Sequence, residues 1–109
     1  MVVRIELWNL GDSLTTIGEL RRYLQDESVD AYEEVEGLRF RAWISDEAGE
    51  RWGTFSLWET RAAGDQELSD RVAELAGKGP DLVEEFELEA TIEGRFEFPG
   101  LSRLGLAFE

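Results

Sequence analysis

The segment GLRFRAWISDEAGERWGTFSLWET, residues 37–60, decides the fold of this chain. Its alternating pattern predicts two β-strands, residues 37–47 and 49–60, which meet in a tight turn at residues 47–49. Because successive side chains of a strand point to opposite faces, the hairpin has two faces of different composition. The apolar face carries Leu38, Phe40, Ala42, Ile44, Phe55 and Leu57. The other face combines indoles, guanidinium groups and hydroxyls: Arg39, Arg41, Trp43, Trp52, Thr54, Ser56 and Trp58.

Two further segments alternate in the same way and predict strands over residues 2–10 and 83–93. With the hairpin and two helices, the element order is βαββαβ. This order predicts an α+β fold of the ferredoxin-like kind, a four-stranded antiparallel sheet with both helices on one face. We expect one domain, residues 1–98, followed by an apolar extension, residues 99–109, that docks on its own or a partner subunit.

The helices are predicted from apolar residues at helical spacing, over residues 13–34 and 62–77. Asp12 or Ser13 is the expected cap of the first helix, and residues 26–30 are its weakest part. The sequence GKGP at residues 77–80 is a helix stop, since it lacks the spacing of a phosphate-binding loop.

The sheet is expected to turn its apolar face toward the helices and its indole face away from them. Val3, Ile5 and Leu7 belong to the apolar face, and so do Phe86, Leu88, Ala90 and Ile92. The indole face carries all four tryptophans, with Arg4, Glu6, Trp8, Glu87 and Glu89 added to the residues of the hairpin. Four solvated indoles would form an unusual exposed patch, so we expect a homodimer in which a second copy covers this face.

Two interpretations of the indole face stay open. In the first, its charges only hold the dimer together, with Arg39 or Arg41 paired to Glu87 or Glu89 because a buried charge needs a partner. In the second, the dimer encloses a pocket whose tryptophans bind a flat small molecule, since aromatic walls with a few polar groups are typical of ligand sites.

Composition excludes several classes of function. The chain has no cysteine and no histidine, which removes disulfides, thiolate metal sites, the usual haem ligand and every Ser-His or Cys-His nucleophile. A formal net charge of −14 argues against nucleic-acid binding. We expect no signal peptide, no membrane segment and a cytoplasmic location. The acidic run of Glu84, Glu85, Glu87 and Glu89 is not expected to bind a metal, because alternation separates Glu84 from the others.

The element order, the run from Gly37 to Trp43, Gly53 and the strand ending at residues 57–59 resemble the dimeric α/β-barrel superfamily. Within it, the chain is most similar to the small monooxygenases of the antibiotic-biosynthesis kind, over residues 2–95. The resemblance implies a homodimer with a cleft between sheet and helices, and in some members oxidation of aromatic substrates by O₂ without metal or flavin. It also implies roles for Asn9, which would hold a substrate oxygen, and Trp58, which would flank the substrate. Haem-degrading members use a histidine that this chain lacks.

The leading functional prediction is therefore a cofactor-independent, monooxygenase-like protein that binds a small aromatic molecule. Such chemistry requires an electron-rich anion of the substrate, which an arginine can stabilise in a site without water. The catalytic candidates are Asn9, Trp58 and Arg41. The substrate-binding candidates are Trp8, Arg39, Trp43, Trp52, Thr54, Ser56, Glu87 and Glu89. A non-catalytic binding or stress-related protein of the same architecture, and an isomerase or cyclase with a carboxylate base, remain as alternatives.

Overall fold

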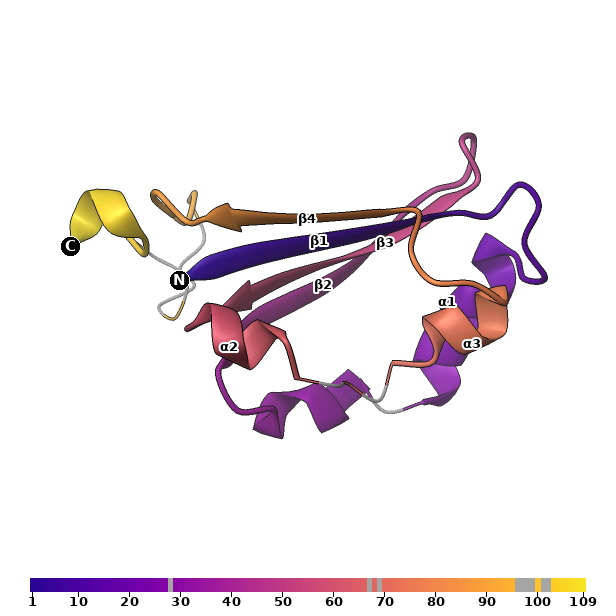
Figure 1. The fold of residues 1–109 in the computed structure, drawn as a ribbon, viewed down its shortest axis with the longest axis horizontal. Coiled ribbons are helices and arrows are strands. Elements are labelled where there is room, and N and C mark those ends of the chain that lie inside the picture. The colour runs from indigo at the N-terminus through magenta and orange to yellow at the C-terminus, as the bar shows by residue number, and fades with distance from the viewer. Residues whose placement is uncertain (28, 67, 69, 96–99, 101–102) are drawn as a thin grey trace.

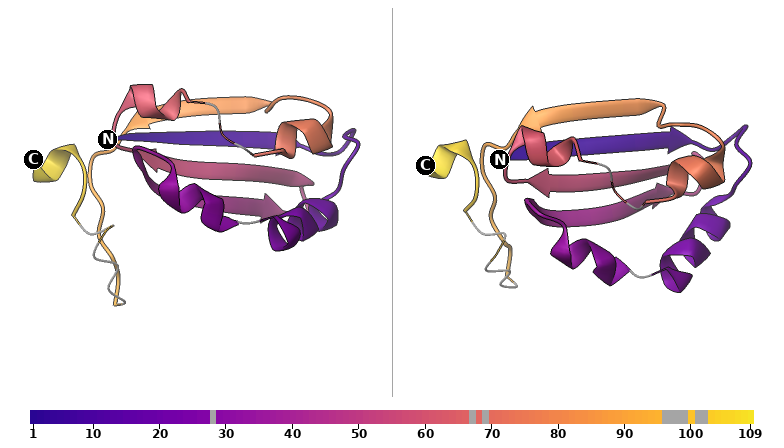
Figure 2. Two further views of the ribbon diagram at one scale, coloured as in Figure 1. Left: turned by 90° about the horizontal axis from the view of Figure 1, so that it is seen from below. Right: turned by 60° about the horizontal axis from the view of Figure 1, so that its bottom comes forward.

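The computed structural model describes residues 1–109 except residues 28, 67, 69, 96–99 and 101–102 (Figure 1). A sheet forms one layer, and short helices form a second layer on one side of it (Figure 2). The strands are β1 (Val2–Asn9), β2 (Leu38–Asp46), β3 (Arg51–Trp58) and β4 (Leu82–Glu87). The helices are α1 (Ile17–Asp26), α2 (Arg61–Gly64) and α3 (Val72–Ala76), with 3₁₀ turns η1 (Val29–Glu34) and η3 (Leu106–Phe108).

The prediction of an α+β fold with a four-stranded antiparallel sheet is confirmed. The strand order is β2-β3-β1-β4, and every neighbouring pair is antiparallel. This order is compatible with the ferredoxin-like arrangement. A register shift between Leu38 and Phe40 leaves Arg39 as an extra residue on β2, so the alternation of the hairpin is interrupted there.

The first helix is shorter than predicted. It begins after Thr16, whose hydroxyl accepts a hydrogen bond from the Glu19 amide at 3.2 Å, and not after Asp12 or Ser13. It ends at Asp26, and the chain continues as η1, so the expected weak point does interrupt the helix. No helix in the described part of the chain is long and apolar enough to cross a membrane.

The prediction of one continuous helix over residues 62–77 is wrong. Two short helices, α2 and α3, are separated at residues 65–71, of which residues 67 and 69 lie outside the described residues. Gly64 ends α2 against Trp58: a Cβ atom at Gly64 would lie 3.2 Å from Trp58 Cδ1. Asp70 accepts a hydrogen bond from the Val72 amide at 3.0 Å, which satisfies the start of α3. Gly77 ends α3 with a left-handed φ of 78°.

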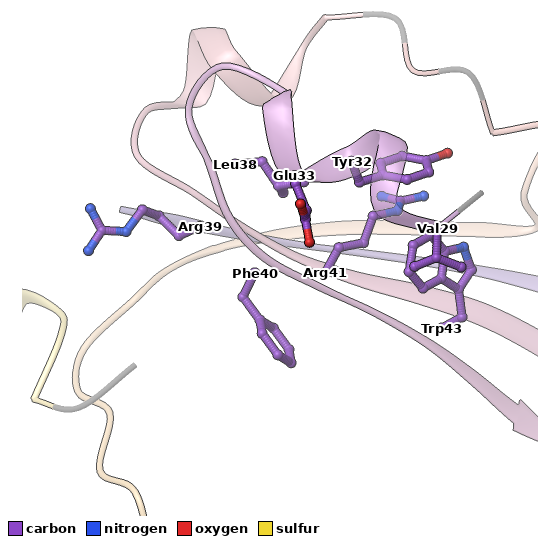
Figure 3. A pocket seen from close by; sticks show the side chains of 8 residues that line it. All are labelled: Val29, Tyr32, Glu33, Leu38, Arg39, Phe40, Arg41 and Trp43. Atoms are coloured by element: carbon purple, nitrogen blue, oxygen red, sulfur yellow. The ribbon is translucent and has the colours of Figure 1, made fainter. Parts of the chain in front are cut away.

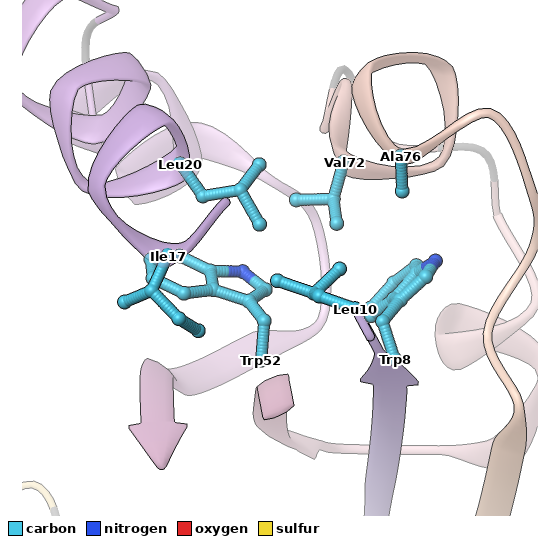
Figure 4. Close-up of a cluster of buried hydrophobic side chains, with 7 residues drawn as sticks. All are labelled: Trp8, Leu10, Ile17, Leu20, Trp52, Val72 and Ala76. Carbon is cyan, nitrogen blue, oxygen red and sulfur yellow. The ribbon is translucent and has the colours of Figure 1, made fainter. Parts of the chain in front are cut away.

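The sorting of side chains into two faces is confirmed except at the bulge, where Leu38 lies opposite Trp58 on the indole face. The prediction of which face meets the helices is wrong. Trp8 lies opposite Trp52, and Arg41 lies opposite Ser56, as the alternation requires. This indole face packs under the helices (Figure 4), whereas the apolar face is the open one. The same chain already buries three of the four indoles, Trp8, Trp52 and Trp58, so their burial does not require a second copy. An indole offers 150–250 Å² of surface to bury, so covering this face removes a large apolar area from water.

The hydrophobic core lies between the sheet and helices α1 and α3 (Figure 4). Trp8 and Trp52 rise from the sheet toward the helices, and the Trp8 indole donates a hydrogen bond to the Lys78 carbonyl at 3.1 Å. The large rings fill the volume that short helices with few apolar residues cannot fill. The remaining core residues are Leu10, Ile17, Leu20, Val72 and Ala76.

The open face of the sheet remains apolar and partly exposed. Val3 and Leu57 are buried at its centre, and the Phe40 and Phe55 rings meet edge to face at 6.1 Å. Toward its margins Ile44 is 45% exposed and Phe86 52% exposed. Among the described residues, no helix covers this face (Figure 1).

The last predicted strand is also shorter than expected. β4 ends at Glu87, and Ile92 is exposed instead of facing the core. The chain beyond β4 folds back on itself: the amides of Leu106 and Ala107 donate hydrogen bonds to the carbonyls of Leu88 and Glu89. Phe96, Phe98 and Leu101, which belong to the predicted apolar tail, lie outside the described residues.

Candidate functional site

Arg41 is the centre of a buried polar cluster between the sheet and the helices. Its guanidinium group donates a hydrogen bond from Nη2 to Asp70 Oδ2 at 2.7 Å and one from Nη1 to Ser56 Oγ at 2.7 Å. The Trp43 indole donates to the same Asp70 oxygen at 3.2 Å. The side chains of Arg41 and Asp70 are only 7% and 11% exposed, so this ion pair is largely shielded from water.

Two aromatic rings flank the guanidinium group of Arg41. Its Cζ atom lies 5.0 Å from the centre of the Tyr32 ring and 5.1 Å from the centre of the Trp43 ring. The two rings themselves meet edge to face, with centres 5.2 Å apart. Both arginine contacts are within cation–π range, which adds to the ion pair in holding the charge in place.

A cavity of about 320 Å³ opens beside this cluster, at the free edge of β2 (Figure 3). The strand forms one wall and η1 forms the other. Tyr32, Trp43 and Arg41 gather at one end of this cavity, whereas the Phe40 side chain points to the opposite side of the strand. The lining residues are Val29, Tyr32, Glu33, Leu38, Arg39, Phe40, Arg41 and Trp43.

A second cavity, of about 180 Å³, also has Arg41 and Asp70 in its wall. It lies between β1 and α3 and is lined in addition by Glu6, Trp8 and Val72. Arg41 therefore contributes to the walls of both cavities.

Arg41 is also incompletely hydrogen-bonded. Its Nε atom is buried and has no hydrogen-bond partner among the described residues. A buried N–H group without an acceptor destabilises the protein by roughly 1–3 kcal/mol. A buried ion pair by itself is weak evidence for stability, since desolvation offsets most of the attraction. Among the described residues, the cluster therefore leaves one buried donor, Arg41 Nε, without an acceptor.

Several predicted site residues do meet in this region. Arg41, Trp43 and Ser56 belong to the cluster, and Thr54 is buried on the same face, opposite Trp43. Trp8 reaches the second cavity. Arg39 lines the larger cavity but points away from Arg41, and it pairs with Glu59 at 3.0 Å (Figure 3).

Other predicted site residues lie elsewhere. Asn9 is exposed at the end of β1, and its side chain accepts a hydrogen bond from the Gly11 amide at 3.3 Å. Trp58 is buried under α2, and Trp52 belongs to the hydrophobic core. None of these three residues lines either cavity beside Arg41.

Within the chain, Arg39 and Arg41 do not pair with Glu87 or Glu89, and a pairing between two subunits stays a prediction. The two arginines lie on β2, whereas Glu87 ends β4 at the opposite edge of the sheet. Glu87 instead pairs with Arg61 at 3.3 Å, and Glu89 follows the end of β4. In the part of the chain that the structure describes, no group of three or more acidic side chains can hold a metal ion.

The sequence-based prediction missed Tyr32 and Asp70, the two partners that complete the cluster. Tyr32 was assigned to the end of a long helix, and Asp70 lies in the interval where one continuous helix was expected. The aspartate two residues before Val72 was nevertheless a readable signal, because such a side chain often accepts a hydrogen bond from an amide at a helix start.

No family model matches this chain, and no curated protein matches it. The proposed function therefore rests on the geometry of the site.

Proposed function

We propose that this protein binds a small, flat aromatic molecule in the cavity between η1 and β2. The observation that carries the proposal is the buried Arg41 guanidinium group, which lies between the Tyr32 and Trp43 rings at one end of this cavity. Ligand pockets typically combine aromatic walls with a few fixed polar groups. The cavity volume of about 320 Å³ is at the lower end of the range for ligand sites, which favours a ligand of one to three rings.

Titration calorimetry with two naphthalene probes tests this proposal. The probes are 2-naphthoate, which is an anion at neutral pH, and the neutral 2-naphthylmethanol. The variant Tyr32→Leu removes one wall and is expected to weaken binding of a probe about three- to tenfold, the size of one aromatic contact. Phe108→Leu is the matched control, because Phe108 lies in η3 and does not line this cavity. If neither probe binds, or if both variants weaken binding equally, the cavity is not the site.

We also propose that the protein is a homodimer joined through the open apolar face of the sheet. Phe40, Ile44, Leu82 and Phe86 are exposed there. Alternation also places Glu84 on this face and, at one end of it, the ion pair of Asp46 and Arg51. A chain of net charge −14 repels its own copy over most of its surface, so a face of low charge is the best contact for a second copy. Packing two such sheets together gives the dimeric α/β-barrel architecture that the sequence resembles.

Sedimentation velocity tests the dimer. Ile44→Asp and Phe86→Asp place a charge on the open face and should convert a dimer into a monomer. Gln25→Asp, on the exposed side of α1, adds the same charge without affecting the assembly. A wild-type protein that sediments as a monomer at every concentration would rule out this interface.

For the chemistry, we propose cofactor-independent oxygenation of the bound ligand, with a non-catalytic binding protein as the alternative. Arg41 favours oxygenation, because a shielded positive charge beside an aromatic cavity stabilises an enolate or phenolate. In the balanced reaction, an activated CH₂ group becomes a carbonyl group, O₂ supplies its oxygen atom, and the second oxygen atom leaves as water.

Oxygen uptake with anthrone, in the presence of a metal chelator, separates the two alternatives. An oxygenase consumes O₂ faster than a protein-free control, and Arg41→Met loses this activity while Arg41→Lys retains part of it. If O₂ is consumed only at the protein-free rate while the naphthalene probes bind normally, the protein is a binding protein and not an oxygenase.

A further inference from the structure

We propose that the ligand of the η1–β2 cavity is a planar aromatic carboxylate, and that its carboxylate takes the place of Asp70 on Arg41. This inference rests on the proposed binding function and narrows it to one class of ligand. Asp70 then acts as a built-in competitor that occupies the anion site in the free protein.

The hydrogen bonds of Arg41 carry the argument. In a guanidinium group, Nε and Nη2 lie on the same edge, and a free carboxylate binds that edge with two parallel hydrogen bonds. Asp70 uses only half of the edge: its Oδ2 atom accepts from Nη2 at 2.7 Å, while Nε has no partner among the described residues. The other oxygen, Oδ1, accepts a hydrogen bond from the Val72 amide at 3.0 Å and does not accept one from Nε.

The donors and the competing acceptor differ in how they are held. Arg41 and Trp43 project from β2, and Ser56, which accepts from Arg41, projects from β3. The sheet therefore fixes the positions of the donors. Asp70 lies in the connection between α2 and α3, outside any helix or strand. An exchange of carboxylates on Arg41 thus requires a change in this connection and leaves the sheet as it is.

The two cavities beside Arg41 provide the space for the incoming carboxylate and for the displaced Asp70 side chain. Arg41 lines both the η1–β2 cavity and the smaller cavity behind Asp70, which has a volume of about 180 Å³. A ring that lies along Tyr32 and Trp43 places its carboxylate at the end of the cavity that Arg41 closes (Figure 3). Asp70 can then withdraw toward the smaller cavity, whose wall it already forms.

The variant Asp70→Asn tests this exchange by titration calorimetry. It removes the competing charge but keeps a side-chain oxygen for the Val72 amide, so we expect 2-naphthoate to bind about tenfold more tightly than to wild type. Binding of neutral 2-naphthylmethanol should change less than about twofold, because this probe does not compete for Arg41. Asp46→Asn is the charge-matched control: it breaks the exposed pair with Arg51 and should leave both affinities unchanged.

Trp43 provides a second readout in the wild-type protein, which does not depend on the folding of any variant. The chain has four tryptophans, so its indole N–H signals in a ¹H–¹⁵N spectrum are few, and Trp43→Phe identifies the one of interest. Saturating 2-naphthoate should shift the Trp43 signal by a larger amount than 2-naphthylmethanol does, because the indole exchanges one carboxylate for another.

Three results separate this inference from the proposed function. Tighter naphthoate binding by Asp70→Asn, with the Trp43 shift, supports both. Binding of both probes at Trp43, with an equal or weaker naphthoate affinity in Asp70→Asn, overturns the exchange but leaves the binding function. No binding of either probe to wild type or Asp70→Asn overturns both.

Discussion

Replacing Trp58 by alanine tests which face of the sheet is the core. Trp58 lies on the indole face beneath α2 and is 1% exposed. From the sequence alone, the apolar face of the sheet is the one expected to pack against the helices. If the indole face is the core, this substitution leaves a large cavity. A buried Trp→Ala substitution costs about 3–5 kcal/mol of unfolding free energy.

This cost is a large fraction of the total unfolding free energy of a domain of 109 residues. Domains of this class have unfolding free energies of about 5–15 kcal/mol, so Trp58→Ala should lower the unfolding temperature by roughly 15–30 °C. Urea denaturation followed by circular dichroism measures the free energy directly, and the slope of the transition shows whether unfolding remains two-state.

Ile44→Ala is the control on the opposite face. The Ile44 side chain is 45% exposed, so in the monomer we expect Ile44→Ala to lower the unfolding free energy by about 1 kcal/mol or less. The two variants are compared at protein concentrations low enough to exclude dimerisation. A cost of less than about 1 kcal/mol for Trp58→Ala, or an equal cost for Ile44→Ala, would refute the assignment of the core to the indole face.

Three further predictions concern single elements. Thr16→Ala removes the cap that accepts from the Glu19 amide and should lower the unfolding free energy by about 1 kcal/mol in urea denaturation, so an unchanged midpoint would contradict the assigned helix start. Gly77→Ala should lower the unfolding free energy by about 1 kcal/mol or more, because Gly77 has a left-handed φ of 78° that alanine rarely adopts; Gly79→Ala, whose new Cβ would meet no atom within 4 Å, should be close to neutral in the same assay. A hydrogen bond from the backbone N–H of Asn9, and then one from the Lys78 side chain, lower the pKa of Asp81 below its ordinary value. The ionised Asp81 carboxylate therefore stabilises the folded protein. This contribution to the unfolding free energy is complete above the unfolded-state pKa of about 3.9 and is lost as pH falls through the lower folded-state pKa. Urea denaturation of Asp81→Asn should show a deficit relative to wild type at pH 7 that disappears in acid, and a deficit that persists in acid would contradict this linkage.

Much of the sheet was predictable from the sequence. Alternation in residues 37–60 gave the hairpin, and it placed Arg41, Trp43 and Ser56 on one face together, as the register confirms. Strand side chains follow the backbone, so such predictions need no knowledge of distant residues. The break after α1 was also foreseen, because Ser28, Val29 and Asp30 are poor helix formers.

The candidate site was predictable only in part. The arginine and the indole were identified from their strand, but their partners Tyr32 and Asp70 come from η1 and from the connection before α3. Both segments were expected to be helical. Hydrophobic spacing over residues 62–77 could not show that Gly64 packs against Trp58 and that the chain leaves the helix there.

The sequence by itself determined which side chains share a face of the sheet, because the direction of a strand side chain depends only on its position in the backbone. Only the tertiary structure decided which face the helices cover, and with it whether the indoles form a core or a surface. The same packing brought Asp70 to Arg41, 29 residues away in the chain. Such a contact depends on where short helices come to rest on a sheet, and no local pattern in the sequence records that position.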